Sequence, residues 1–214
     1  MFDSFELFVF DLDGTLADSR EDLTASVNAM RARFGLKRLP VEQVAGYVGE
    51  GMRLLIERSL ADSPGTPIEE AMRIFSAHYS EHCLDRTRPY PGVMETLARL
   101  SERAKLAVAS NKPEAMTVRM LEAFGIAPML SAIIGGDTLR NRKPDPEPVL
   151  EIMRRAGKTA SVTLVVGDGW TDIAAGKAAG AKTCYVPGIG DPVKAAAAGP
   201  DFRISDIREL AAPA

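Results

Sequence analysis

The fold is decided by the stretch Phe5-Glu6-Leu7-Phe8-Val9-Phe10-Asp11-Leu12-Asp13-Gly14-Thr15, in which an apolar run ends abruptly at an aspartate. Short, almost continuous apolar runs are typical of strands that are buried on both faces of a parallel sheet. Four later runs have the same character: residues 106–109, 132–134, 162–166 and 183–186. The sequence therefore predicts a parallel sheet whose first strand ends at Asp11.

Helical segments alternate with these runs. They are predicted at residues 93–103, 114–124, 146–156 and 171–179. Gly125, Gly157 and Gly180 stand where the C-termini of three such helices are expected, a position that favours glycine. Alternation of strand and helix predicts an α/β fold with a doubly wound, Rossmann-like parallel sheet.

One long interval, from about Asp18 to Asp85, contains no convincing strand. Its apolar residues recur at helical spacing, and a Pro-Gly-Thr-Pro break at residues 64–67 separates two helices. We therefore expect an α/β core domain built from residues 1–16 and 87–214, with an all-helical domain inserted at residues 17–86.

The composition excludes several classes of protein. The chain has 214 residues, and its 26 Lys and Arg against 29 Asp and Glu give a net charge of −3, too mild for a nucleic-acid binder. Its apolar runs are far shorter than the roughly 18 residues of a membrane helix, and its acidic N-terminus lacks the basic start of a secretory signal. Two cysteines, Cys83 and Cys184, cannot form a disulfide framework. A cytoplasmic location is expected, without membrane or nucleic-acid partners.

Polar residues follow three of the predicted strands. Asp11 and Asp13 follow the first, Ser110-Asn111 follow the second, and Asp168 follows the fourth. In an open α/β sheet, ligands bind outside the carboxyl ends of the strands, so these residues are expected to converge. A single such Asp is adequately explained as a turn residue. Crowded carboxylates, however, repel one another unless a cation lies between them, and oxygen ligands favour Mg²⁺.

Together these residues resemble the four ordered motifs of the haloacid dehalogenase superfamily. The resemblance extends over essentially the whole chain, and the helical insertion falls where that superfamily places its cap. Residues 47–55 and 198–204 are similar to segments of the phosphoglycolate phosphatase branch. The four motifs are Asp11-Leu12-Asp13-Gly14-Thr15-Leu16, Ser110-Asn111, Lys143-Pro144-Asp145-Pro146, and Gly167-Asp168 with Asp172.

The resemblance implies how the reacting groups divide the chemistry. Asp11 is expected to be the nucleophile that forms an aspartyl-phosphate, and Asp13 the general acid that later activates water. The carboxylates of Asp11 and Asp168 and the backbone carbonyl of Asp13 are expected to hold Mg²⁺. Asp13 also distinguishes phosphate-ester chemistry from dehalogenation, since dehalogenases of the superfamily lack this second aspartate.

Further residues are implied to bind the phosphate. Ser110 and the Asn111 backbone N–H are expected to hydrogen-bond the phosphoryl oxygens, while Gly14 leaves room for close approach of the backbone. Lys143 is expected to offset the charge of nucleophile and phosphate. Asp172 is expected to orient Lys143 or a metal-bound water.

The resemblance predicts a Mg²⁺-dependent phosphatase acting on a small phosphorylated metabolite, with 2-phosphoglycolate as the first candidate. In the predicted cap, Arg53 is a candidate for binding a substrate carboxylate, against the alternative of a solvated helix arginine. Two other functions stay open from sequence alone. One is a phosphomutase similar to β-phosphoglucomutase, and the other is a non-catalytic phosphate-accepting signalling domain. The sequence does not determine the oligomeric state.

Overall fold

Six parallel strands form the central sheet of the computed structural model, which describes residues 1–212. β1 lies inside the sheet between β4 and β6, and the order across it is β5-β4-β1-β6-β7-β8. The chain thus builds one half of the sheet outward from β1 and then returns to build the other half. The strands are β1 (Leu7–Phe10), β4 (Lys105–Ala109), β5 (Leu130–Ile134), β6 (Thr163–Gly167), β7 (Lys182–Tyr185) and β8 (Phe202–Arg203).

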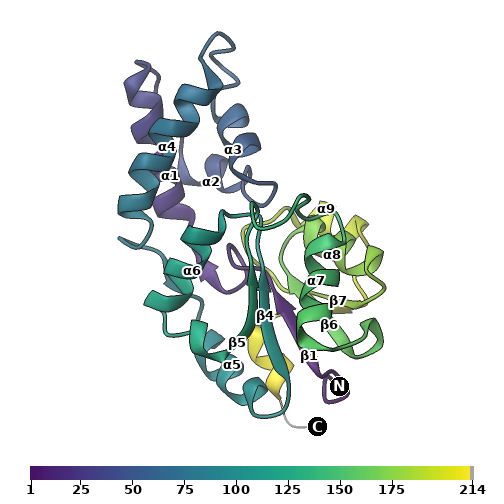
Figure 1. Cartoon of the computed structure of the whole chain (residues 1–214). Helices are drawn as coiled ribbons and strands as arrows, with labels where there is room; N and C mark the ends of the chain where they lie inside the picture. Colours follow the sequence, from purple (N-terminus) through teal and green to yellow (C-terminus); the bar gives the residue numbers. More distant parts are fainter. Residues whose placement is uncertain (213–214) are drawn as a thin grey trace.

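Helices cover both faces of this sheet (Figure 1). Alternate residues of β1 point to opposite faces, so Phe8 and Phe10 join one buried apolar cluster while Leu7 and Val9 join another. The first cluster includes side chains of α5 (Val93–Ser101), α6 (Glu114–Ala123) and η3 (Ile207–Ala211). The second includes side chains of α7 (Glu147–Ala156) and α8 (Trp170–Ala178). Burial on both faces explains why the strands are apolar throughout.

Four helices occupy the interval between residues 18 and 88, after the first long strand and before α5. They are α1 (Arg20–Arg33), α2 (Val41–Ala45), α3 (Met52–Ser59) and α4 (Ile68–His82), and they form a group beside the sheet (Figure 1). The chain leaves the core through β2 (Ala17–Asp18) and returns through β3 (Arg88–Pro89), which pair antiparallel. Asp22, in α1, links these two connections. Its Oδ2 accepts hydrogen bonds from the backbone N–H and the hydroxyl of Thr87, just before β3, at 2.8 and 2.7 Å.

The predicted fold class is confirmed, as each predicted strand and core helix is present within one or two residues of its expected ends. Gly125, Gly157 and Gly180 adopt positive φ just beyond helices, as expected of C-terminal glycines. The two-residue β8 and the short α2 had no sequence prediction, since a few residues carry too little periodicity. Within residues 1–212, no helix combines the length and hydropathy that a membrane crossing requires.

Candidate active site

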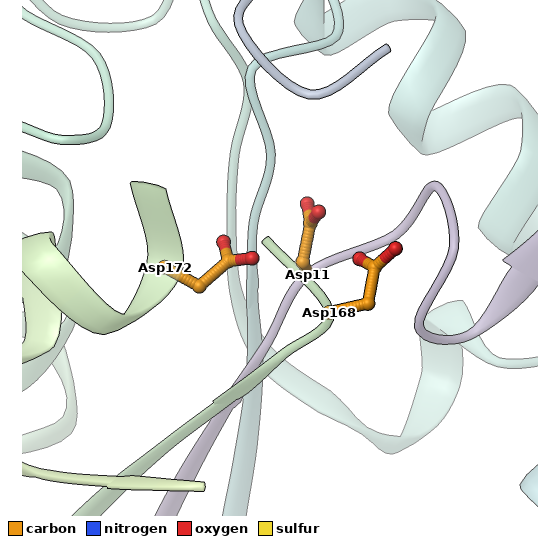
Figure 2. Close-up of side chains that lie close together, drawn as sticks. All are labelled: Asp11, Asp168 and Asp172. Atoms are coloured by element: carbon orange, nitrogen blue, oxygen red, sulfur yellow. The ribbon is translucent and has the colours of Figure 1, made fainter. Parts of the chain in front are cut away.

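Three aspartates from two neighbouring strand ends meet at one edge of the sheet (Figure 2). Asp11 follows β1, Asp168 follows β6, and Asp172 lies in the first turn of α8. One carboxylate oxygen from each lies within 4.8 Å of the others, and the three residues are only 8, 3 and 1% exposed. The edge where they meet is the point at which the chain switches from one half of the sheet to the other, which is where open α/β sheets bind ligands.

The local backbone holds this convergence in place. The Asp11 N–H donates to Val166 O at 3.0 Å, so the pairing between β1 and β6 continues one residue past the strand and fixes Asp11 beside Asp168. Gly14 then turns the chain with φ +89°, and a Cβ atom there would lie only 2.1 Å from Asp168 Oδ2. Glycine is needed at position 14 for both its backbone angle and the space it leaves.

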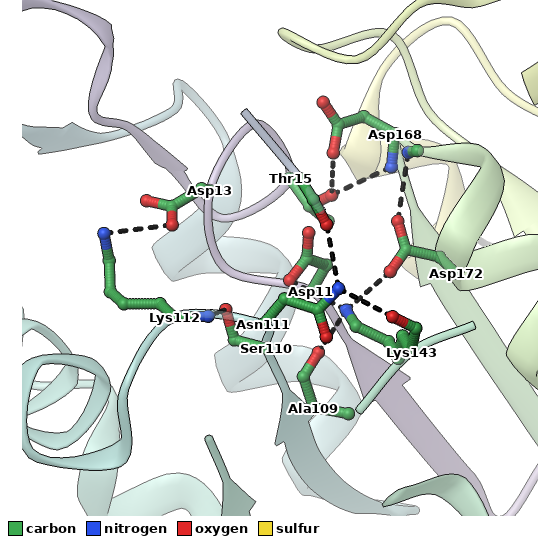
Figure 3. A network of polar contacts seen from close by, with 12 residues as sticks. Asp11, Asp13, Thr15, Ala109, Ser110, Asn111, Lys112, Lys143, Asp168 and Asp172 are labelled. Carbon is green, nitrogen blue, oxygen red and sulfur yellow. Dashed lines mark hydrogen bonds and ion pairs between the residues drawn. The ribbon is translucent and has the colours of Figure 1, made fainter. Parts of the chain in front are cut away.

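Lys143 supplies the positive charge of the cluster (Figure 3). Its Nζ lies 2.6 Å from Asp172 Oδ1 and 2.9 Å from Asp11 Oδ1, and it also donates to Ala109 O. Burial disfavours the ammonium, but the two carboxylates outweigh that effect and raise the pKa of Lys143 above its ordinary value. Asp172 is itself fixed by the Gly169 N–H, which donates to its Oδ2 at 3.0 Å.

One ammonium faces three buried carboxylates, which leaves the cluster with excess negative charge. Burial, followed by the neighbouring carboxylates, raises the pKa of Asp168 to about 8. Burial likewise raises the pKa of Asp11 to about 7, although Lys143 opposes it. Among the described residues no donor makes an aligned hydrogen bond to Asp11 Oδ1, despite the nearby ammonium. Such a set of buried oxygen ligands fits a hard divalent cation, which would stabilise the ionised forms.

Two residues that had no sequence prediction orient Asp168. Thr15 and Asp168 exchange two hydrogen bonds of 3.1 Å, one between the side chains and one from the Asp168 N–H to the threonine hydroxyl. The Gly190 N–H donates to Asp168 Oδ2 at 2.7 Å. Because the carboxylate is held from two sides, its position is fixed independently of Lys143.

Asp13 lies in a different environment from the three clustered aspartates. Ser19 donates to its Oδ1 at 2.6 Å. Lys112 Nζ lies 3.0 Å from its Oδ2, a contact that Figure 3 shows. Lys112 also donates to the Tyr79 hydroxyl at 2.6 Å. Sequence reasoning missed all three partners. Lys112 directly follows the Ser110-Asn111 motif, and that adjacency was the available signal; Ser19 and Tyr79 had none.

Ser110 and Asn111 lie at the end of β4 beside this cluster, and both are buried. The Asn111 side-chain amide donates to Lys143 O at 2.8 Å and to Gly49 O at 2.9 Å. Gly49 belongs to the loop before α3, so this amide joins the inserted helices to the core. Between them lies a cavity lined by both parts of the chain, with Asp11 and Asp13 at one end and apolar side chains of α1, α3 and α4 at the other.

The structure brings together every core residue predicted from sequence but does not bring Arg53 to the cavity. Met52 and Leu55 line the cavity from α3, while Arg53 is turned about 100° from Met52 around the helix. The guanidinium instead pairs with Glu69 and, at 3.7 Å, with Glu57, and its side chain is 45% exposed. Arg53 therefore takes the alternative position of a solvated helix arginine.

Known proteins share both the sequence and the fold. The family model of haloacid dehalogenase-like hydrolases matches residues 8–186. A phosphoglycolate phosphatase of Aquifex aeolicus is 37% identical over 205 residues, covering 95% of this chain and 94% of its own. Phosphoglycolate phosphatase 1 of Pseudomonas aeruginosa is 39% identical, covering 95% and 78%. The crystal structure of a predicted phosphoglycolate phosphatase from Haemophilus somnus superposes with a TM-score of 0.91 at 31% identity, covering 97% and 96%.

Proposed function

The chain belongs to the haloacid dehalogenase-like hydrolase family, in its phosphoglycolate phosphatase-like branch, and we propose that it is a Mg²⁺-dependent phosphatase of small phosphorylated metabolites. As a phosphoric monoester hydrolase it must attack phosphorus and protonate the leaving oxygen. One observation carries the assignment of these two tasks. Asp11 and Asp13 are two residues apart on one loop, yet they have separate partners, Lys143 for the first and Ser19 with Lys112 for the second. Two carboxyl groups held in different environments suit two different roles.

Asp11 is the proposed nucleophile, and its attack on phosphorus forms an aspartyl-phosphate while the ester oxygen leaves. The reaction needs the ionised carboxylate, whereas burial raises the pKa of Asp11 to about 7. Lys143 stabilises the ionised form from 2.9 Å, and Asp172 holds Lys143 in that position. Asp172 thereby acts through Lys143 rather than on the substrate.

Asp13 is the proposed general acid and base. In the first step it gives a proton to the leaving ester oxygen, and in the second it takes a proton from the water that hydrolyses the aspartyl-phosphate. Ser19 fixes its orientation through the 2.6 Å hydrogen bond to Oδ1. Ser110 and the Asn111 N–H bind the phosphoryl oxygens at the end of β4, and Gly14 permits their close approach.

The residues proposed to hold Mg²⁺ are Asp11, Asp168 and, through its carbonyl, Asp13. The cation would neutralise the buried carboxylates and the phosphate that approaches them. The burial of Asp11 and Asp168 with raised pKa values supports this choice, since both groups are costly to ionise without a cation. Thr15 and Gly190 keep Asp168 in place for that role.

We further propose that residues 17–86 form a cap domain over a core of residues 1–16 and 87–214. The paired crossings β2 and β3 and the Asp22 link to Thr87 support this division, because they bring both connections to one point. A cap closed over the cavity excludes bulk water from the reacting groups. The Asn111 contact with Gly49 is one of the contacts that such a closed position makes.

The substrate proposed first is 2-phosphoglycolate, on the strength of the relatives named above. The test is a panel of phosphorylated metabolites assayed for phosphate release, with kcat/KM compared in Mg²⁺ and in EDTA. We expect 2-phosphoglycolate to rank highest and EDTA to abolish turnover until Mg²⁺ is added. Metal-independent turnover would contradict the carboxylate site. Transfer of the phosphoryl group between sugar positions, without steady phosphate release, would instead identify a phosphomutase.

A further inference from the structure

We infer that Lys112 and Tyr79 form the subsite that binds a carboxylate on the substrate, so that this pair, rather than Arg53, selects carboxylated phosphate esters. The inference rests on the proposed function, because it assigns the non-phosphate part of the substrate within the same cavity. Lys112 comes from the loop after β4 and Tyr79 from α4, so the subsite is made of one residue from the core and one from the inserted helices.

The composition of the cavity wall singles out Lys112. Most of the lining beyond the strand ends is apolar and comes from the inserted helices and α6. Among residues 1–212, Lys112 is the one cationic side chain that lines this cavity, and it is only 7% exposed. A carboxylate entering an apolar cavity loses its water and needs a charged partner there. The apolar lining consists of Leu23, Val48, Met52, Leu55, Phe75, Pro113 and Met116.

The distance from Asp13 places Lys112 within reach of a short substrate. The ester oxygen must lie beside Asp13 to receive its proton, and Lys112 Nζ lies 3.0 Å from Asp13 Oδ2. In 2-phosphoglycolate the carboxyl carbon is two bonds from the ester oxygen. A substrate whose ester oxygen contacts Asp13 therefore has its carboxylate next to the Lys112 ammonium. A longer chain between the ester oxygen and the carboxylate would place the carboxylate beyond Lys112.

The hydrogen-bonding capacity of the pair leaves donors for the substrate. An ammonium has three N–H donors, and Lys112 directs one to the Tyr79 hydroxyl and one toward Asp13. The Tyr79 hydroxyl accepts from Lys112 and keeps its own proton, since burial raises the pKa of Tyr79 well above its ordinary value. One N–H and one O–H, side by side at the cavity wall, can bind the two oxygens of a carboxylate.

The experiment compares two substrates that differ in this group: 2-phosphoglycolate, and 2-hydroxyethyl phosphate, in which an alcohol replaces the carboxylate. Initial rates in Mg²⁺ give kcat and KM for the wild type, Lys112→Met and Tyr79→Phe. We expect Lys112→Met to lower kcat/KM for 2-phosphoglycolate about 10- to 100-fold more than for the alcohol, mainly through KM, as for a lost charge-assisted hydrogen bond. Tyr79→Phe is expected to lower the same ratio about 2- to 10-fold.

The comparison separates recognition from other effects of the substitutions. Any disturbance of Asp13 lowers the turnover of both substrates alike. It therefore cancels in the ratio of kcat/KM for 2-phosphoglycolate to kcat/KM for 2-hydroxyethyl phosphate. Lys182→Met is the matched control. Lys182 is the first residue of β7, at the opposite end of the strands from the site, where it pairs with Asp201 at 2.8 Å outside the cavity. Equal losses on both substrates, or a wild-type preference for the alcohol, would overturn the inference alone. Absence of wild-type turnover on every phosphate ester would overturn the proposed function itself.

Discussion

The two ends of the active-site cavity are built in opposite ways. At the strand ends, one carboxylate oxygen from each of three buried aspartates lies within 4.8 Å of the others, and Lys143 pairs with two of them, Asp11 and Asp172. At the end formed by the inserted helices, the wall is apolar and one cation, Lys112, faces it. The first end is electrostatically crowded, and the second is sparse.

The difference indicates which part of the molecule sets which property. Phosphoryl transfer requires fixed charges around phosphorus whatever the substrate, and rigid strand ends hold such charges well. The remainder of the proposed substrate would lie against uncharged side chains from α1, α3 and α4, none of which holds a group at the strand ends in place except Tyr79, which contacts Lys112. Each prediction below tests whether chemistry and selectivity are separated in this way.

The largest effect is expected at the nucleophile. Asp11→Asn keeps the size of the side chain but removes its charge and its ability to form an aspartyl-phosphate. We expect kcat on p-nitrophenyl phosphate to fall at least about a thousandfold, as for removal of a nucleophile in other enzymes. Asp3→Asn, an exposed aspartate far from the site, is the control and should retain activity. Turnover retained by Asp11→Asn would refute the nucleophile assignment.

The next effect concerns the stability of the crowded end. Lys143→Met leaves Asp11 and Asp172 buried without their cation, and breaking a buried ion pair in this way costs about 3–5 kcal/mol. We expect that loss in the free energy of unfolding, measured with urea in EDTA. The same substitution at Lys182, whose side chain is 56% exposed in its pair with Asp201, should cost about 1 kcal/mol or less. Similar losses of stability at both positions would mean that the buried aspartates do not depend on the charge of Lys143.

A pH dependence of stability follows from the raised pKa values of Asp11, about 7, and Asp168, about 8. The folded state holds protons that the unfolded state, with a pKa of 3.8, has lost. In EDTA the free energy of unfolding should therefore fall as the pH rises from 5.5 to 8, by up to about 1.4 kcal/mol per pH unit for each group. Mg²⁺ should remove much of this fall.

Asp168→Asn is the comparison that isolates this effect. It removes one of the two groups, so its stability in EDTA should decline less steeply with pH than that of the wild type. His78 acts in the opposite direction, because burial lowers its pKa and its contribution grows as the pH rises toward 6.5. Since His78 is present in both proteins, it cancels in the difference. A wild type that gains stability relative to Asp168→Asn between pH 5.5 and 8 would contradict the prediction.

The contrast between the two ends also explains what the sequence could and could not predict. Asp11, Asp168 and Lys143 belong to motifs at strand ends, and parallel strands bring their carboxyl ends to one edge wherever the motifs lie along the chain. The parallel sheet could be predicted from its apolar runs, because strands buried on both faces are apolar wherever they lie along the chain. Arg53 and Tyr79 lie on helices, where the direction of a side chain depends on how each helix rotates against its neighbours. Helical periodicity gives the buried stripe of α3 but not which part of it faces the cavity.

The smallest effect is expected at Arg53, and it tests the sparse end directly. Its guanidinium pairs with Glu57 and Glu69 on the solvent side of α3, and exposed ion pairs of this kind contribute little. Arg53→Ala should therefore change KM by less than about twofold for both 2-phosphoglycolate and 2-hydroxyethyl phosphate. A KM that rises about tenfold for the carboxylated substrate alone would show that Arg53 reaches the substrate when the substrate binds. Selectivity would then reside in α3, and Lys112 would serve Asp13 instead.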